Sequence, residues 1–183
     1  NSHDLALMNG LIKILILCFL TFSVAGKAYA GPKSVGATFC YGNIGLAYEH
    51  EIDSDSFAEI QLRAETICMF DGKSDIPGIS GSFTWNLRLA EYKSRNGNVI
   101  DFFAGPGLIG GFSQDRNRPG NIFLGFKGKI GGECTFCRNI ALSISVSPVI
   151  GVHFGREDEM LNMHLYRNGL LYSIMPEIGI RYS

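Results

Sequence analysis

The sequence has little charge and no strong excess of either sign. Lysine and arginine number 16 and aspartate and glutamate 17, which gives a formal net charge of −1. Charged residues make up 18% of the chain, against about 25% in a typical soluble domain. Binding to nucleic acid requires a positive surface, so this composition gives no reason to expect such a partner.

Long apolar runs are missing except near the N-terminus. No other segment reaches the roughly 18 consecutive apolar residues that a transmembrane helix needs. The mean hydropathy is nevertheless slightly positive, at +0.13, and glycine is abundant, with 23 residues. A fairly apolar, glycine-rich chain without a helical membrane span is typical of a membrane β-barrel.

The motifs of several common sites are also missing. The sequence contains no glycine-rich phosphate loop, no EF-hand loop and no H-x-x-x-H pattern. Cys134 and Cys137 form a single C-x-x-C pair, whereas a structural zinc site requires two such pairs or added histidines. After export this pair would form a disulfide across a turn or remain as two free thiols. We expect no metal and no cofactor.

The apolar segment near the N-terminus has the order of an export signal. Lys13 precedes the apolar run ILILCFLTF at residues 14–22, and an A-x-A cleavage site ends at Ala30. We therefore expect residues 1–30 to hold an upstream remnant, before Met8, and a Sec signal peptide that is cleaved after Ala30. Residues 31–183 would form one domain, the size of a small eight-stranded barrel.

The segment Ile140–Phe154, IALSISVSPVIGVHF, alternates between apolar residues and small, mostly polar ones. A β-strand turns successive side chains to opposite faces, so this segment predicts a strand whose apolar face carries no charge. The same alternation recurs along the chain. It predicts eight strands, at residues 34–41, 44–52, 57–70, 79–92, 99–113, 122–136, 140–154 and 170–183.

Two features modify this alternation. The apolar positions change parity at Gly42-Asn43, and we divide the run there into two strands because a one-residue phase change turns every later side chain to the other face. Pro106, Pro148 and Pro176 fall within predicted strands. Proline has no N–H to donate to a neighbouring strand, so these positions predict local bulges or bends.

After the tight Gly42-Asn43 hairpin, which departs from the pattern, the connections alternate between short turns and longer loops, with longer loops at residues 71–78, 114–121 and 155–169. Outer-membrane barrels show this alternation, because their periplasmic turns are short and their outer loops are long. The C-terminus would lie on the periplasmic side.

The polar face is rich in small residues and carries charges of both signs, which can pair inside a narrow barrel. The expected interior charge network comprises Glu59, Arg63, Glu65, Arg88, Lys127, Lys129, Glu177 and Arg181. The same face also carries the carboxylates of Glu49, Glu51, Asp101 and Glu133. Aromatic residues of the apolar face gather near strand ends. Those expected at the outer rim are Tyr41, Phe70, Phe112, Phe154 and Tyr172, and those at the inner rim are Phe102, Phe136 and Tyr182.

Aromatic girdles at two depths are typical of membrane interfaces. The sequence therefore predicts an all-β fold, an eight-stranded antiparallel up-and-down transmembrane β-barrel with a polar interior filled by side chains. Eight strands leave a lumen just wide enough for side chains to fill.

With its signal peptide, the early segment GATFCYG and the closing segment PEIGIRYS, the sequence resembles the small outer-membrane β-barrel proteins of the OmpA/OmpX-like superfamily, in the form common among Bacteroidetes-type bacteria. The resemblance covers residues 31–183. It implies a monomer in the bacterial outer membrane, in contact with lipid and lipopolysaccharide. Tyr182 resembles the C-terminal aromatic signal that the barrel-assembly machinery reads, although Ser183 stands last where the family usually has phenylalanine.

A structural or interaction role follows as the leading expectation: membrane integrity, adhesion or docking. The interaction candidate is the segment Gly155–Gly169, GREDEMLNMHLYRNG, which mixes charged and apolar residues. Its candidate binding residues are Arg156, Glu157, Asp158, His164 and Arg167. An extracellular protein, another outer-membrane protein or lipopolysaccharide could bind there; alternatively, the segment is a solvated loop.

Three alternatives remain open. A lipid A deacylase or acyltransferase would use His153, with Ser113 and Ser173 at similar depths, although the His-Ser-Asn pattern of the deacylase family is absent, so a role without catalysis is favoured. A narrow channel would be lined by Arg63 or Lys127. A periplasmic lipocalin-like carrier would place the apolar face inside and hold an apolar ligand.

Overall fold

The structure, a computed structural model, describes residues 33–66, 78–94, 97–115, 118–136, 139–157, 160–165 and 175–182. All the regular secondary structure among these residues consists of β-strands. None of these residues belongs to a helix long and apolar enough to cross a membrane. The expected signal peptide at residues 1–30 lies outside the described residues.

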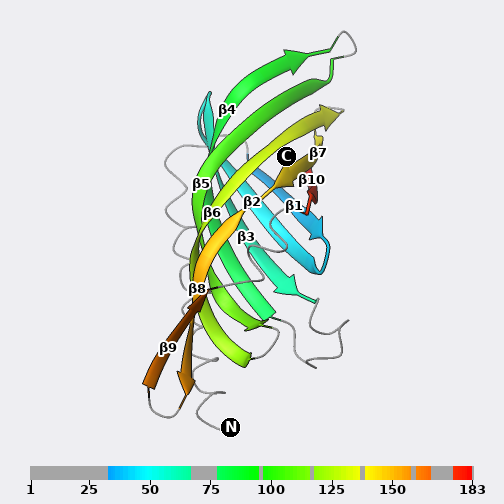
Figure 1. The fold of residues 1–183 in the computed structure, drawn as a ribbon. Coiled ribbons are helices and arrows are strands. Elements are labelled where there is room, and N and C mark those ends of the chain that lie inside the picture. The colour runs from blue at the N-terminus through cyan, green and yellow to red at the C-terminus, as the bar shows by residue number, and fades with distance from the viewer. Residues whose placement is uncertain are drawn as a thin grey trace. The chain divides into compact units, whose positions relative to one another are not determined.

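The strands form a closed antiparallel barrel (Figure 1). Each of the first six strands pairs with the next one along the chain. These strands are β1 (Lys33–Cys40), β2 (Asn43–Asp53), β3 (Ser56–Glu65), β4 (Gly78–Lys93), β5 (Val99–Asp115) and β6 (Arg118–Phe136). β7 (Ile140–Val146) pairs with β6 and with β10 (Glu177–Tyr182), and β10 pairs with β1. This last pairing closes a ring of eight strands, so the prediction of an eight-stranded antiparallel barrel is confirmed.

The predicted strand at residues 140–154 is interrupted at Ser147-Pro148. It continues as β8 (Val149–Glu157), and both β7 and β8 pair with β6. At the interruption, the Pro148 carbonyl accepts a hydrogen bond of 2.8 Å from the Gly128 N–H. Pro106, by contrast, remains within β5, opposite Gly128, and Pro176 lies just before β10.

An additional strand, β9 (Met160–Leu165), pairs with β8 to form a hairpin (Figure 1). The predicted loop over residues 155–169 is therefore wrong for residues 155–157 and 160–165. The predicted loop at 114–121 is also wrong where the chain is described, because Asp115 of β5 pairs with Arg118 of β6. The polar residues of these segments favour a loop, but backbone N–H and C=O groups can extend a ladder whatever the side chains are.

Two tight turns show why particular residues stand where they do. Gly42 has φ 74°, a left-handed conformation that glycine reaches without Cβ strain, and it divides β1 from β2 as predicted. In the turn from β2 to β3, Asp53 Oδ1 accepts hydrogen bonds from Ser56 Oγ (2.8 Å) and from the Asp55 N–H (3.0 Å). Both hydrogen bonds stabilise the charged form and lower the pKa of the exposed Asp53 carboxyl.

The two faces of the barrel differ sharply in polarity. In β7 the burial alternates at every residue, with Ser143 and Ser145 buried and Leu142 and Ile144 exposed. In the other strands, the buried positions likewise include charged residues, and the exposed positions carry large apolar side chains. The interior is therefore polar, apart from a small apolar cluster of Ile109, Phe123 and Val149.

Candidate functional site

Glu59 of β3 lies at the centre of the interior charge network and is 1% exposed. Its carboxylate accepts two hydrogen bonds from Lys129 Nζ of β6, at 2.6 and 2.5 Å, and one from Arg181 of β10, at 2.8 Å. Arg181 also forms ion pairs with Glu49 of β2, at 2.8 Å, and with Glu133 of β6. Because β3, β6 and β10 are not neighbours in the ring, these contacts span the lumen.

A second cluster is built around Gln61, which is fully buried. Gln61 Nε2 donates to Glu177 Oε1 at 2.9 Å, and its Oε1 accepts from Lys127 Nζ at 2.6 Å. Lys127 also donates to Ser82 Oγ at 3.1 Å, and Arg63 forms an ion pair with Glu177. An uncharged amide thus connects a buried cation with a buried carboxylate.

The two clusters form one network, because Lys129 Nζ lies 3.6 Å from Glu177 Oε1. A buried charge without a partner is costly in a low dielectric, whereas complementary charges with hydrogen bonds offset that cost. The network thus connects strands that are not neighbours in the ring through ion pairs and hydrogen bonds. It fills the middle of the lumen with side chains.

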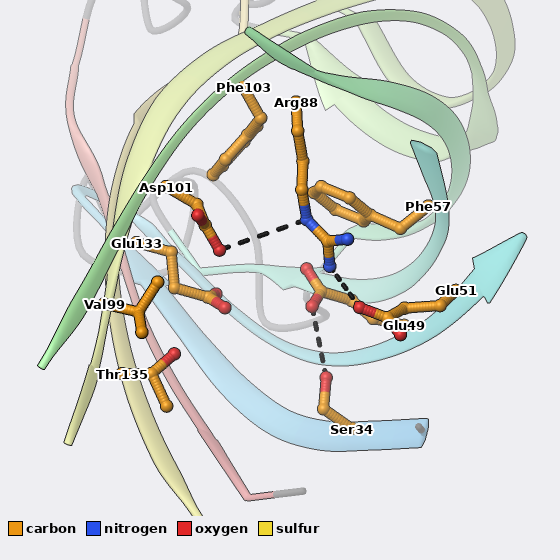
Figure 2. A pocket seen from close by; sticks show the side chains of 10 residues that line it. All are labelled: Ser34, Glu49, Glu51, Phe57, Arg88, Val99, Asp101, Phe103, Glu133 and Thr135. Carbon is orange, nitrogen blue, oxygen red and sulfur yellow. Dashed lines mark hydrogen bonds and ion pairs between the residues drawn. The ribbon is translucent and has the colours of Figure 1, made fainter. Parts of the chain in front are cut away.

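A third group of charges lies near one end of the barrel, beside the network residues Glu49 and Glu133 (Figure 2). Arg88 of β4 forms an ion pair with Glu51, and its Nε lies 3.9 Å from Asp101 Oδ2. The guanidinium also stands over the Phe57 ring, 5.6 Å from the ring centroid.

The structure thus brings six of the eight predicted network residues together: Glu59, Arg63, Lys127, Lys129, Glu177 and Arg181. Arg88 belongs to the third group, and Glu65 is buried nearer the opposite end. The prediction overlooked Gln61 and Ser82 because it considered charged residues alone. Their inward parity, shared with Glu59 and Thr84, was the available signal.

His153, the candidate catalytic residue, is 2% exposed inside the barrel. Its ring packs beside Phe123, with 5.7 Å between ring centroids. The Ser113 side chain and Ser173 lie outside the described residues. The enzymatic hypothesis therefore rests on a histidine enclosed by the barrel wall.

The candidate binding segment is only partly described. The backbones of Arg156 and Glu157 belong to β8 and that of His164 to β9, but their side chains are not among those described. Asp158 and Arg167 lie outside the described residues.

Cysteines and metal ligands add no second site where the chain is described. Cys134 is partly buried, and Cys137 lies outside the described residues, so their disulfide stays a prediction. Within the described ranges, no group of three or more histidine, cysteine, aspartate or glutamate side chains could hold a metal ion.

Comparisons with protein-family models, with curated proteins and with solved structures find no match for this chain. The resemblance to the OmpA/OmpX-like superfamily stays a prediction.

Proposed function

We propose that this protein is an integral outer-membrane β-barrel with a closed interior, whose role is structural or interactive. The observation that carries the proposal is the inverted distribution of polarity. Phe126 on the outer face is 75% exposed, whereas Glu59 and Arg181 in the interior are 1% and 2% exposed. A hydrocarbon environment stabilises this arrangement, since it removes apolar surface from water and leaves the buried charges paired with one another.

The apolar face extends across neighbouring strands and supports this proposal. Phe83, Leu108, Phe126 and Ile150 occupy one row across β4, β5, β6 and β8, and all are exposed. Monomeric soluble proteins seldom expose contiguous apolar patches beyond a few hundred Å².

Aromatic residues near both ends of the barrel, on its apolar outer face, further support the membrane proposal. At the rim near the β5–β6 connection, Phe112, Ile122 and Phe154 form one row. At the opposite rim, Phe136, Ile140 and Tyr182 form another. Amphipathic aromatic side chains favour the boundary between lipid and water.

The filled lumen favours a structural or interactive role over a channel, because Lys129 and Glu59 are fully buried where they meet. The β8–β9 hairpin offers an attachment surface, with Met163 64% and Leu165 51% exposed. We infer that it projects outward and that the end near Tyr182 faces the periplasm.

The direct test is insertion into lipid. The mature chain, folded in detergent, should migrate differently on SDS gels before and after boiling, as folded membrane barrels do. In phospholipid vesicles, Phe126→Arg should lower the free energy of unfolding by about 2–4 kcal/mol, because it places a charge near the middle of the apolar outer face.

The matched control is Tyr182→Arg at the rim, where the same charge should cost at most about 1 kcal/mol. Solubility without detergent, together with a Phe126→Arg variant more soluble than the original, would show that the apolar face meets water. That result would reject the membrane location.

A further inference from the structure

A cavity of about 230 Å³ lies at the end of the barrel where β2 connects to β3 (Figure 2). It is many times larger than the space one water molecule needs. Four carboxylates line it, from Glu49, Glu51, Asp101 and Glu133. Glu49 and Glu133 also belong to the interior network through Arg181, whereas the proposed membrane role does not account for the open space beside them.

The charges around this cavity do not balance. Two guanidinium groups contact the four carboxylates: Arg88 pairs with Glu51 and Asp101, and Arg181 pairs with Glu49 and Glu133. An excess of negative charge in a partly enclosed space attracts cations.

Asp101 is the least compensated of the four carboxylates. Its contact with Arg88 is long, at 3.9 Å. Its other oxygen, Oδ1, is shielded from solvent and has no hydrogen-bond partner among the described residues. Because the Asp101 side chain lines the cavity and is 19% exposed, a cation in the cavity can still reach this carboxylate.

The register of the sheet strengthens this argument. Asp101 and Glu133 lie directly opposite each other on β5 and β6, and like charges in that position destabilise a sheet. Glu49 and Glu59 are opposed in the same way on β2 and β3, but there Arg181 lies 2.8 Å from both carboxylates. Within the described part of the chain, no single cation joins Asp101 and Glu133 in this manner.

The wall beside these carboxylates is aromatic. Phe57 and Phe103 both line the cavity and meet edge to face, with 5.4 Å between ring centroids and 77° between ring planes. Aromatic faces attract cations and pack against aliphatic chains. Since the described residues contain no group of three or more histidine, cysteine, aspartate or glutamate side chains that could hold a metal ion, the aromatic wall favours an organic cation.

We propose that this cavity binds a small alkylammonium or guanidinium group, placed between Asp101 and Glu133 with its carbon chain against Phe57 and Phe103. The group could belong to a free small molecule or to a lysine or arginine side chain of another protein. The proposal depends on the barrel fold and goes beyond the proposed membrane role.

The test is calorimetric titration of the full mature barrel, folded in zwitterionic detergent, with 1,4-diaminobutane. We expect saturable binding, and no binding of the uncharged analogue 1,4-butanediol. Asp101→Asn should weaken binding at least about tenfold, because it removes a charge-assisted contact. Asp55→Asn removes the same charge from an exposed turn position at the same end of the barrel, and it should leave the affinity unchanged.

Val99→Phe provides a second variant that keeps every charge. Val99 lines the cavity, so the larger ring should abolish binding by occupying the space. Gel mobility before boiling verifies that each variant is folded. If Asp101→Asn does not fold, Val99→Phe alone decides the outcome.

A capped Gly-Arg-Gly peptide distinguishes the two sources of the cation. Binding at least tenfold tighter than that of diaminobutane would assign the site to a protein side chain, and the reverse to a free molecule. The proposal would be overturned if neither probe showed saturable binding. It would also be overturned if the Asp101→Asn variant bound diaminobutane as tightly as the original protein, or if equimolar Mg²⁺ displaced the probe. None of these results bears on insertion into lipid, which the Phe126→Arg test decides separately.

Discussion

At the scale of single residues, Glu59 shows how a buried charge becomes a structural element. Its carboxylate accepts hydrogen bonds from Lys129 and Arg181, which come from two other walls of the barrel. Neither cation can be rehydrated without opening the lumen. The stability of the centre therefore depends on the negative charge of one side chain.

Glu59→Gln should lower the free energy of unfolding in phospholipid vesicles by about 3 kcal/mol, because removing one partner leaves buried cations without full compensation. Trp85, the single tryptophan, lies on the outer face, so its fluorescence reports unfolding in urea. The matched control is Glu51→Gln, whose ion pair with Arg88 is partly exposed and should contribute less than about 1 kcal/mol. Equal effects of the two substitutions would show that the network redistributes its charges.

At the scale of elements, the close contact of β4 and β5 depends on glycine. A Cβ atom at Gly105 would lie 2.6 Å from the carbonyl carbon of Trp85 and 2.7 Å from Asn86 Cα, both on the backbone of β4. Backbone atoms cannot move aside as the end of a flexible side chain can, so a side chain at Gly105 would push the two strands apart.

Gly105→Ala should accordingly cost about 2 kcal/mol of unfolding free energy, the typical penalty for overpacking. Gly110→Ala, on the same strand, is the control. Its nearest neighbour would be the terminal Leu124 Cδ1, at 3.2 Å, which can rotate away, and the change should stay within about 0.5 kcal/mol. The urea titration that follows Trp85 measures both variants, and a harmless Gly105→Ala would mean that β4 and β5 can separate without loss.

At the scale of the whole molecule, the closure of the barrel and the filling of its lumen both depend on β10. The pairing of β10 with β1 completes the ring, and the same strand carries Arg181 and Glu177 into the lumen. Closing the barrel therefore also positions the side chains that block it, which distinguishes this barrel from a wide, water-filled pore.

The filled lumen predicts that the protein does not conduct ions. In planar lipid bilayers, the inserted barrel should show no discrete current steps, whereas an open porin reconstituted in the same way should show them. Insertion is verified independently from the fluorescence of Trp85. Regular current steps that change their ion selectivity in Arg63→Ala would instead establish the narrow channel.

The sequence by itself determined the class of fold, because a period of two in apolar residues is a local property of each strand. It also located the division at Gly42, since glycine tolerates the backbone conformation that the turn requires. Local chemistry did not show that β5, β6 and β8 extend beyond their predicted ends, because strand length there depends on pairing with a neighbour.

Only the tertiary structure decided which charges meet. Glu59, Lys129 and Arg181 are far apart in the sequence, and their contact follows from the register and curvature of the closed sheet. The same register places Asp101 opposite Glu133 and assigns Arg181 to one of these carboxylates and not to both. Periodicity predicts the face on which a side chain lies, but its partners across the lumen depend on how the strands close, which no local pattern specifies.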